Sequence, residues 1–334
     1  MFGIIRVIII YSMKTKLIIS LSLIFLLPFF ASAHVKWFVD SSAVLPIEPY
    51  SLVDWQVLMG IMLAMVVVAI AFMLERKLPS LDKIFPSFFE RINFRTASLF
   101  SIFIGIGLVI FSFNGYIFAP NIIAESSLGY AMLTLQAIIG AAFILGLRVK
   151  SASIFLLLLY LSVLIYFSGW ELIDALDIIG VSFFILLFGR PKWGFKDSTL
   201  LEKITIPYQS FAVPLLRIFT GANLFILGFS EKLSRPDLGI TFLHTHNWNF
   251  MQMLGFENYS DYWFVFSAGI VESLLGLLLI LGLLTRPTAF VLAIFFITTL
   301  ALLGPIELFG HIPHFAIVMI LLVFGSGEKI RVRK

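Results

Sequence analysis

Nine long apolar segments constrain this chain more than any other feature of its sequence. Each has roughly 17–23 residues, which is enough for an α-helix to cross the hydrocarbon core of a bilayer. The segments are about twice as long as the strands of an outer-membrane barrel, and they do not alternate in polarity. The sequence therefore predicts an all-α, polytopic helical membrane protein. The expected spans are at about 55–74, 96–118, 129–147, 151–169, 172–188, 211–230, 263–283, 287–304 and 310–326.

Composition excludes the other broad classes of protein. Of 334 residues, 60% are hydrophobic and 13% are charged, whereas a soluble protein is about 25% charged. Too little polar surface is present to cover a water-soluble globule, and no low-complexity tract indicates disorder. Because the chain has no cysteine, a disulfide scaffold, a thiol nucleophile, an iron–sulfur cluster and c-type haem attachment are excluded. The basic pI of about 9.2 indicates cytoplasmic loops rather than a nucleic-acid partner.

The first 33 residues have the pattern of an export signal. Met1 and Met13 are both candidate start positions, and an uncleaved anchor helix is the alternative to a cleaved signal peptide. Cleavage at the predicted site would leave His34 as the mature N-terminus. The pattern consists of a basic stretch at 13–16, an apolar stretch at 17–30 and a small-x-small cleavage site at 31–33.

Basic residues are distributed unevenly between the two ends of the predicted spans. With the mature N-terminus outside, only Lys36, Lys232 and Arg235 fall on the outer side, against 17 basic residues inside. Cytoplasmic loops carry such an excess of Lys and Arg. The count predicts the bacterial inner membrane, with the mature N-terminus outside and the C-terminus cytoplasmic. The inner residues are Arg76, Lys77, Lys83, Arg91, Arg95, Arg148, Lys150, Arg190, Lys192, Lys196, Lys203, Arg217, Arg286, Lys329, Arg331, Arg333 and Lys334.

Two stretches of the chain resemble each other. Residues 136–189 align without a gap to 272–325, and an offset of 116 pairs Gly105 with Gly221 upstream. The alignment predicts an internal duplication, with two four-helix units in the same orientation. The expected organisation is a signal peptide at 1–33, an outer segment, lead helix and cytoplasmic loop at 34–94, a first unit at 95–190, a cytoplasmic linker at 191–210 and a second unit with a basic tail at 211–334.

The two predicted units differ in charge. Ser101 aligns with Arg217, and Gly115 and Tyr116 align with Glu231 and Lys232. Gln136 likewise aligns with Glu272. The first unit therefore lacks charged side chains at these positions, and we expect any polar site to belong to the second unit.

Four charged residues form the candidate polar intramembrane site: Arg217, Glu231, Lys232 and Glu272. Glu272 lies about ten residues into an apolar segment, where a charged side chain costs at least about 2.5–3.5 kcal/mol. It is therefore expected to face the bundle interior, as a proton or cation site or as a structural hydrogen bond. Lys232 either binds an anion or pairs with the two glutamates. Arg217 either joins this site or anchors the helix to lipid phosphates.

The five histidines His34, His244, His246, His311 and His314 are candidate metal ligands, and all fall on the predicted outer side. An N-terminal histidine offers an amine and an imidazole nitrogen, a combination suited to copper. His244 and His246 share a face if their segment is extended, and His311 and His314 share one if theirs is helical. The alternative interpretation of each pair is a polar rim on the outer surface.

Four motifs in the second unit carry a family resemblance. They are LRIFTG at 216–221, GFSEK at 228–232, ESLLG at 272–276 and LGLLTRP at 281–287. On these motifs, residues 211–326 resemble the DoxX family of four-helix membrane proteins, and 95–189 are similar to a degenerate copy. The family takes its name from a subunit associated with thiosulfate:quinone oxidoreductase, and other members are linked to redox homeostasis. The resemblance implies a redox or quinone-linked role.

Three functions remain open at the level of sequence. The first is a DoxX-like inner-membrane protein with a redox or quinone-linked role. The second is a periplasm-facing copper-binding or copper-delivery protein that uses an N-terminal histidine. The third is a non-catalytic membrane assembly factor. The expected partners are the lipid bilayer and a redox protein, and the expected cofactor is quinone or copper. No HExxH, P-loop, dinucleotide-binding or GxSxG motif identifies a reaction.

Overall fold

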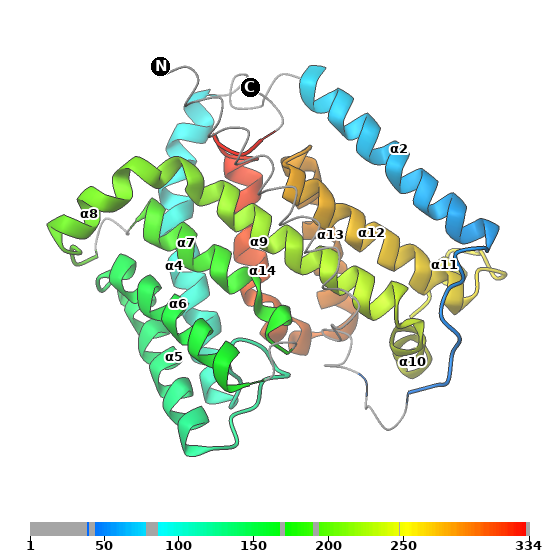
Figure 1. Ribbon diagram of the computed structural model, residues 1–334, viewed down its shortest axis with the longest axis horizontal. Helices are drawn as coiled ribbons and strands as arrows, with labels where there is room; N and C mark the ends of the chain where they lie inside the picture. The colour runs from blue at the N-terminus through cyan, green and yellow to red at the C-terminus, as the bar shows by residue number, and fades with distance from the viewer. Residues whose placement is uncertain are drawn as a thin grey trace, which may run out of the picture.

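A computed structural model describes residues 39, 44–77, 86–167, 171–189, 194–246 and 248–331 (Figure 1). The predicted signal peptide and His34 lie outside these residues. The described chain is all-α, which confirms the predicted class. Its helices are α2 (Trp55–Lys77), α4 (Pro86–Phe113), α5 (Ser127–Leu145), α6 (Val149–Tyr166), η4 (Glu171–Ala175), α7 (Asp177–Phe188), α8 (Thr199–Thr205), η5 (Ile206–Phe211), α9 (Ala212–Leu227), η6 (Gly228–Leu233), α10 (Pro236–His246), α11 (Phe250–Met253), α12 (Asp261–Leu281), α13 (Thr285–Leu303) and α14 (Pro305–Phe324).

Each of the nine predicted spans overlaps a described helix, but the span at 172–188 is divided between η4 and α7, and the span at 211–230 ends in η6. Among the described residues, six helical runs are long and apolar enough to cross a membrane, and α13 and α14 add shorter apolar stretches. α7 has only 12 residues and is preceded by the 3-10 helix η4. The segment expected to be a linker at 191–210 is helical from Thr199 onward, where α8 and η5 lead directly into α9.

The helices of the two predicted four-helix units, α4–α7 and α9–α14, are interlocked rather than side by side. Within the units, α4 packs against α5 and α9 packs against α12. The fourth helix of each unit, however, packs against the first helix of the other, so that α7 contacts α9 and α14 contacts α4. In Figure 1, α9 and α14 cross near the centre of the molecule. One apolar core therefore draws residues from both units, among them Phe100, Phe184, Leu216 and Leu321.

Glycines allow the first two helices of each unit to approach closely. A Cβ atom on Gly105 would lie 2.5 Å from the carbonyl oxygen of Gly140, and one on Gly221 would lie 2.6 Å from that of Gly276. Any larger side chain would push these helix pairs apart. In the sequence alignment, Gly105 pairs with Gly221 and Gly140 pairs with Gly276, so the two contacts are at aligned positions.

The turn between α12 and α13 also joins the lead helix to the second unit. Gly282 ends α12 in the left-handed conformation, with φ 70°, a backbone shape that glycine adopts without steric cost. Leu284 follows at φ 45°, and its amide donates a hydrogen bond to Glu75 Oε2 of α2 at 2.9 Å. The first unit has the same turn, with Gly146 at φ 68° and Arg148 at φ 45°.

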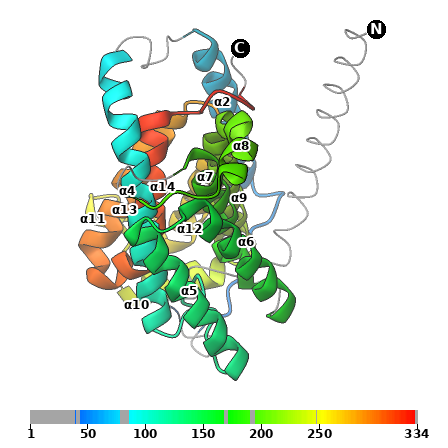
Figure 2. The same ribbon diagram turned by 90° about the vertical axis from the view of Figure 1, so that its left-hand side faces the viewer.

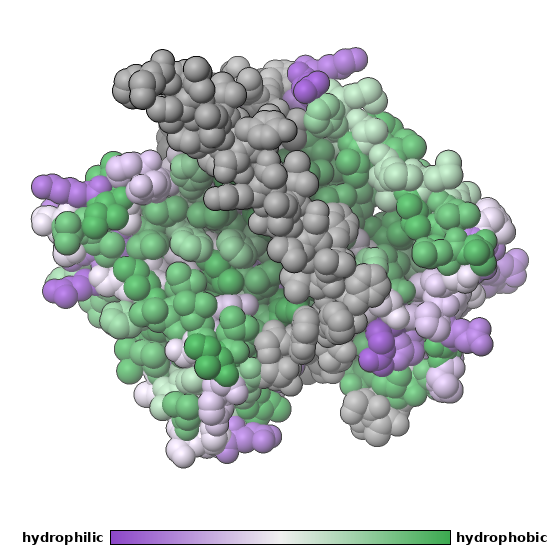
Figure 3. Space-filling model, in the orientation of Figure 1, coloured by the Kyte–Doolittle hydropathy of each residue, from purple (hydrophilic) through white to green (hydrophobic). Residues whose placement is uncertain are grey.

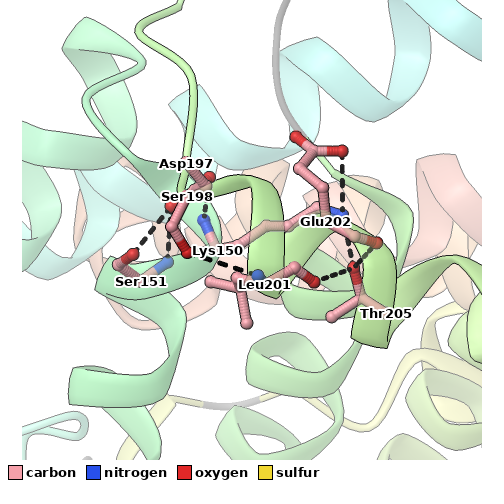
Figure 4. A network of polar contacts seen from close by, with 7 residues as sticks. All are labelled: Lys150, Ser151, Asp197, Ser198, Leu201, Glu202 and Thr205. Carbon is pink, nitrogen blue, oxygen red and sulfur yellow. Dashed lines mark hydrogen bonds and ion pairs between the residues drawn. The ribbon is translucent and has the colours of Figure 1, made fainter.

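A buried lysine ties α8 to the start of α6 (Figure 4). Lys150 Nζ donates a hydrogen bond to Thr205 Oγ1 at 2.6 Å and lies 3.8 Å from Glu202 Oε2. Asp197 accepts hydrogen bonds from the amides of Lys150 and Ser151 at 3.1 and 3.0 Å. It thus supplies an acceptor that the free amides of a first helical turn need.

Apolar side chains cover much of the outer surface, as Figure 3 shows for one face. The lead helix α2 is the most exposed span, because its apolar side chains point outward along its length. α5 and α6 pack together and project from one end of the molecule in Figure 2. Such a surface is expected in lipid, since nothing apolar needs to be hidden from a bilayer. The fold is that of a membrane protein embedded in lipid.

Candidate functional site

The candidate site is centred on an ion pair between η6 and α12. Lys232 Nζ donates a hydrogen bond to Glu272 Oε2 at 2.5 Å. Glu272 lies in the middle of α12, and Lys232 lies in the last turn of the helical run that begins at Thr199. Pairing offsets part of the cost of placing each charge in an apolar environment. The two side chains are 16% and 17% exposed, so the pair is reached from the surface of the described chain.

A local change of helix type positions this pair. Residues 228–233 form a π-helix, η6, where α9 would otherwise continue. At its start, a Cβ atom on Gly228 would lie 2.8 Å from the amide and the hydroxyl of Ser273 on α12. Single π-helical turns inside α-helices are rare and are frequent at functional sites. The sequence analysis did not predict η6, because a π-turn has no simple hydropathy pattern.

Two carboxyl groups lie beside the one lysine. Glu231 is fully buried on the same turn as Lys232, and its charge acts on Lys232 together with that of Glu272. The hydroxyls of Ser230 and Ser273 are buried nearby and have no hydrogen-bond partner among the residues that the structure describes. With all three ionisable groups charged, the cluster carries one net negative charge. This arrangement can therefore take up a proton, or bind a ligand that offers both acceptors and donors.

Arg217 does not belong to this cluster. Its guanidinium is fully buried and donates hydrogen bonds to the carbonyls of Leu279 and Ile280, where α12 ends. It also donates to the carbonyl of Ile330 at 2.6 Å. The last carbonyls of a helix have no partner within it, and Arg217 supplies one. The structure therefore separates Arg217 from the other three predicted residues, and it places the guanidinium on protein carbonyls rather than on lipid phosphates.

The extended backbone expected at residues 244–246 is wrong, because His244 and His246 lie in the last turn of α10. Residues two apart on an α-helix do not face each other. The hydropathy pattern of α10 has the period of a helix, and it outweighs the short His-x-His spacing in determining the backbone conformation. His244 is 60% exposed and lies 3.7 Å from Asp261 Oδ2.

His311 and His314 lie inside the bundle rather than on an outer rim. Their rings on α14 are 5.3 Å apart and both are buried. His314 Nε2 lies 3.6 Å from Asp177 Oδ2 at the start of α7. The sequence analysis missed Asp177, although a carboxyl group in an apolar segment is the signal that identified Glu272. Within the part of the chain that the structure describes, no group of three metal-binding side chains is found.

Comparison with known proteins agrees with the resemblance seen in the sequence. The DoxX family model matches residues 212–305. These residues run from the start of α9 to the start of α14 and include Glu231, Lys232 and Glu272. Neither a search of curated proteins nor a search of solved structures found a match.

Proposed function

From the premise that residues 212–305 form a DoxX domain, we propose that this membrane protein binds a quinone at Lys232 and Glu272 and has a quinone-linked redox role. The single observation that carries the proposal is the ion pair itself. It joins a π-helix to the middle of an apolar helix inside the matched domain. Ionisable groups at such depth are costly and mark functional sites by default.

The chemistry of the site suits a quinone headgroup. The ammonium of Lys232 donates to a quinone carbonyl oxygen, and a carboxylate accepts a proton from a quinol hydroxyl. Quinol oxidation releases two protons and two electrons. Glu272 and Glu231 take the protons, and a redox partner protein takes the electrons, since the cysteine-free chain holds no thiol or iron–sulfur acceptor. Partial exposure of the pair supports entry of a lipid-soluble ligand.

Two substitutions test the proposal. Lys232→Met removes the donor, and Glu272→Gln keeps the shape while removing the proton acceptor. We expect the affinity for a short-chain benzoquinone, measured by calorimetry in detergent, to fall at least tenfold in both variants. Asp237→Asn is the matched control, because Asp237 pairs with Arg235 outside the spans. Unchanged quinone binding in both variants would assign the pair a structural role.

We infer that the two units are copies of one ancestral unit. Support comes from the glycine contacts of Gly105 and Gly221 and from the left-handed turns at Gly146 and Gly282. In both units these features stand at aligned positions. We also propose the orientation with the C-terminus in the cytoplasm of a bacterial inner membrane, which rests on the excess of basic residues at one end of the spans. Cysteine labelling at Lys329 from either side of the membrane tests it.

A further inference from the structure

We propose that the junction of α7, α9 and α14 binds a small monovalent cation, either a proton or sodium. The site consists of Asp177, Thr220, Asn223 and His314. It belongs to the interface between the two units and contains none of the residues of the quinone site. The proposal therefore goes beyond the proposed function and does not depend on it.

Contacts across the junction connect these residues. His314 Nε2 on α14 lies 3.6 Å from Asp177 Oδ2 on α7. Asn223 Nδ2 on α9 donates to the carbonyls of Ile173 and Asp174 in η4, at 2.8 and 3.0 Å. Three elements from the two units therefore meet around the beginning of α7.

The register of α7 against α9 places Thr220 level with Asp177. A Cβ atom on Gly180 would lie 3.0 Å from Leu216 Cα and from Phe219 Cβ. Asn223 contacts η4, which precedes α7, so the two helices run antiparallel. Between these contacts, the turn that holds Asp177 is level with the turn that holds Thr220.

Within the described part of the chain, four polar atoms at this junction have no hydrogen-bond partner. They are Asp177 Oδ2, Thr220 Oγ1, Asn223 Oδ1 and His314 Nδ1. Their residues are 2%, 3%, 0% and 8% exposed, respectively. A buried polar group without a partner is costly, and each such group calls for an explanation, such as a bound ion. Three of the four atoms are oxygens, and oxygens are the ligands that hard cations prefer.

The charges around the site favour a cation over an anion. Among the described residues, no lysine or arginine forms an ion pair with Asp177. Arg217, one turn from Thr220, is directed to the carbonyls of α12. The other neighbours are Tyr160 and Asp174 around Asp177, and His311 and Phe296 around His314.

Sodium binding tests the proposal directly. Purified protein in detergent at alkaline pH is equilibrated with radioactive sodium chloride, and bound ion is counted against choline chloride as the sodium-free salt. We expect one saturable sodium per chain, competed away as the pH falls. Asp177→Asn should abolish binding. Thr220→Val keeps the charge and the shape, and it should weaken binding about tenfold. Asp237→Asn, a carboxyl outside the spans, should bind as the wild type does.

A proton-only site gives a different result in the same protein. Sodium then does not bind, but acidification raises the thermal unfolding midpoint of the wild type and not that of Asp177→Asn. Two outcomes overturn the proposal. One is a wild type whose stability responds to neither cation. The other is an Asp177→Asn or Thr220→Val variant, folded by its thermal transition, that keeps the full wild-type response.

Discussion

The two four-helix units use one aligned position in opposite ways. In the first unit, Gln136 on α5 is fully buried. Its amide nitrogen donates to Leu108 O, Ser112 Oγ and Tyr116 O at 3.0–3.1 Å. Its amide oxygen accepts from the amide of Phe118 at 2.9 Å. Every hydrogen-bonding group of this side chain is thus satisfied within the unit.

In the second unit, the aligned residue is Glu272, and its surroundings differ. Its partner is the charged side chain of Lys232, the pair is partly exposed, and Glu231 adds a second carboxyl group. The segment facing it is a π-helix, whereas the first unit has an irregular loop after Phe113. A neutral amide joins the helices of one unit, whereas the other has two carboxyl groups beside one lysine. That difference is the reason for assigning ligand binding to the second unit.

The largest expected effect concerns Arg217 and its aligned residue Ser101. Arg217→Met removes three hydrogen bonds to backbone carbonyls and should lower the free energy of unfolding by about 3–5 kcal/mol. Ser101→Ala loses one hydrogen bond to the carbonyl of Ser98 and should cost about 1 kcal/mol. Unfolding in mixed detergent micelles measures both. Equal losses would contradict the structural assignment of Arg217.

Gln136→Leu is expected to have the next largest effect. Four hydrogen bonds disappear and the amide of Phe118 remains buried, so the loss of stability should be about 2–3 kcal/mol. Quinone binding should not change. Glu272→Gln should show the reverse pattern, with binding lost and stability lowered by about 1 kcal/mol. If Gln136→Leu abolished quinone binding, the proposed division between the units would fail.

The paired glycines should respond alike. Gly105→Ala and Gly221→Ala each force a Cβ atom against a backbone carbonyl at the closest helix contact, and overpacking of this kind costs about 1–3 kcal/mol. We expect the two losses to agree within experimental error, as measured by thermal unfolding in detergent. A loss confined to one variant would argue against equivalent helix packing in the two units.

The smallest effect is expected outside the spans. The hydrogen bond from Arg235 to the Asp237 carboxylate raises the pKa of Arg235, so the guanidinium stays charged at neutral pH. The pair is partly exposed, and exposed ion pairs contribute about 0–1 kcal/mol. Asp237→Asn should therefore leave the thermal midpoint within one degree or so at moderate salt. A large decrease would mean that α10 depends on this contact.

Hydropathy predicted the helices but not their partners. Nine apolar segments appeared as helices because a backbone in lipid must satisfy its own hydrogen bonds. Segment lengths do not indicate which helix packs against which. The sequence therefore did not predict that α7 packs against α9 and α14 against α4. The side chains at those contacts, such as Phe184 and Leu321, are as apolar as any that face lipid.

The sequence predicted those site residues whose charged side chain stands out in an apolar segment. Glu272 was found because charge in an apolar segment is costly, and its pairing with Lys232 was among the stated alternatives. The partners of Arg217 are backbone carbonyls, which have no sequence signature. Asp177, like Glu272, is a carboxyl group in an apolar segment. It was not predicted, because a polar site was expected only in the second unit. The functional roles of these residues remain predictions.

Native mass spectrometry with added quinone tests the central claim most directly. Wild type, Gln136→Leu and Glu272→Gln are purified from membranes without an affinity metal and compared at one concentration of a short-chain benzoquinone. The account predicts one quinone per chain in the wild type and in Gln136→Leu, and none in Glu272→Gln. A wild type without bound quinone, or an adduct that persists in Glu272→Gln, would contradict it.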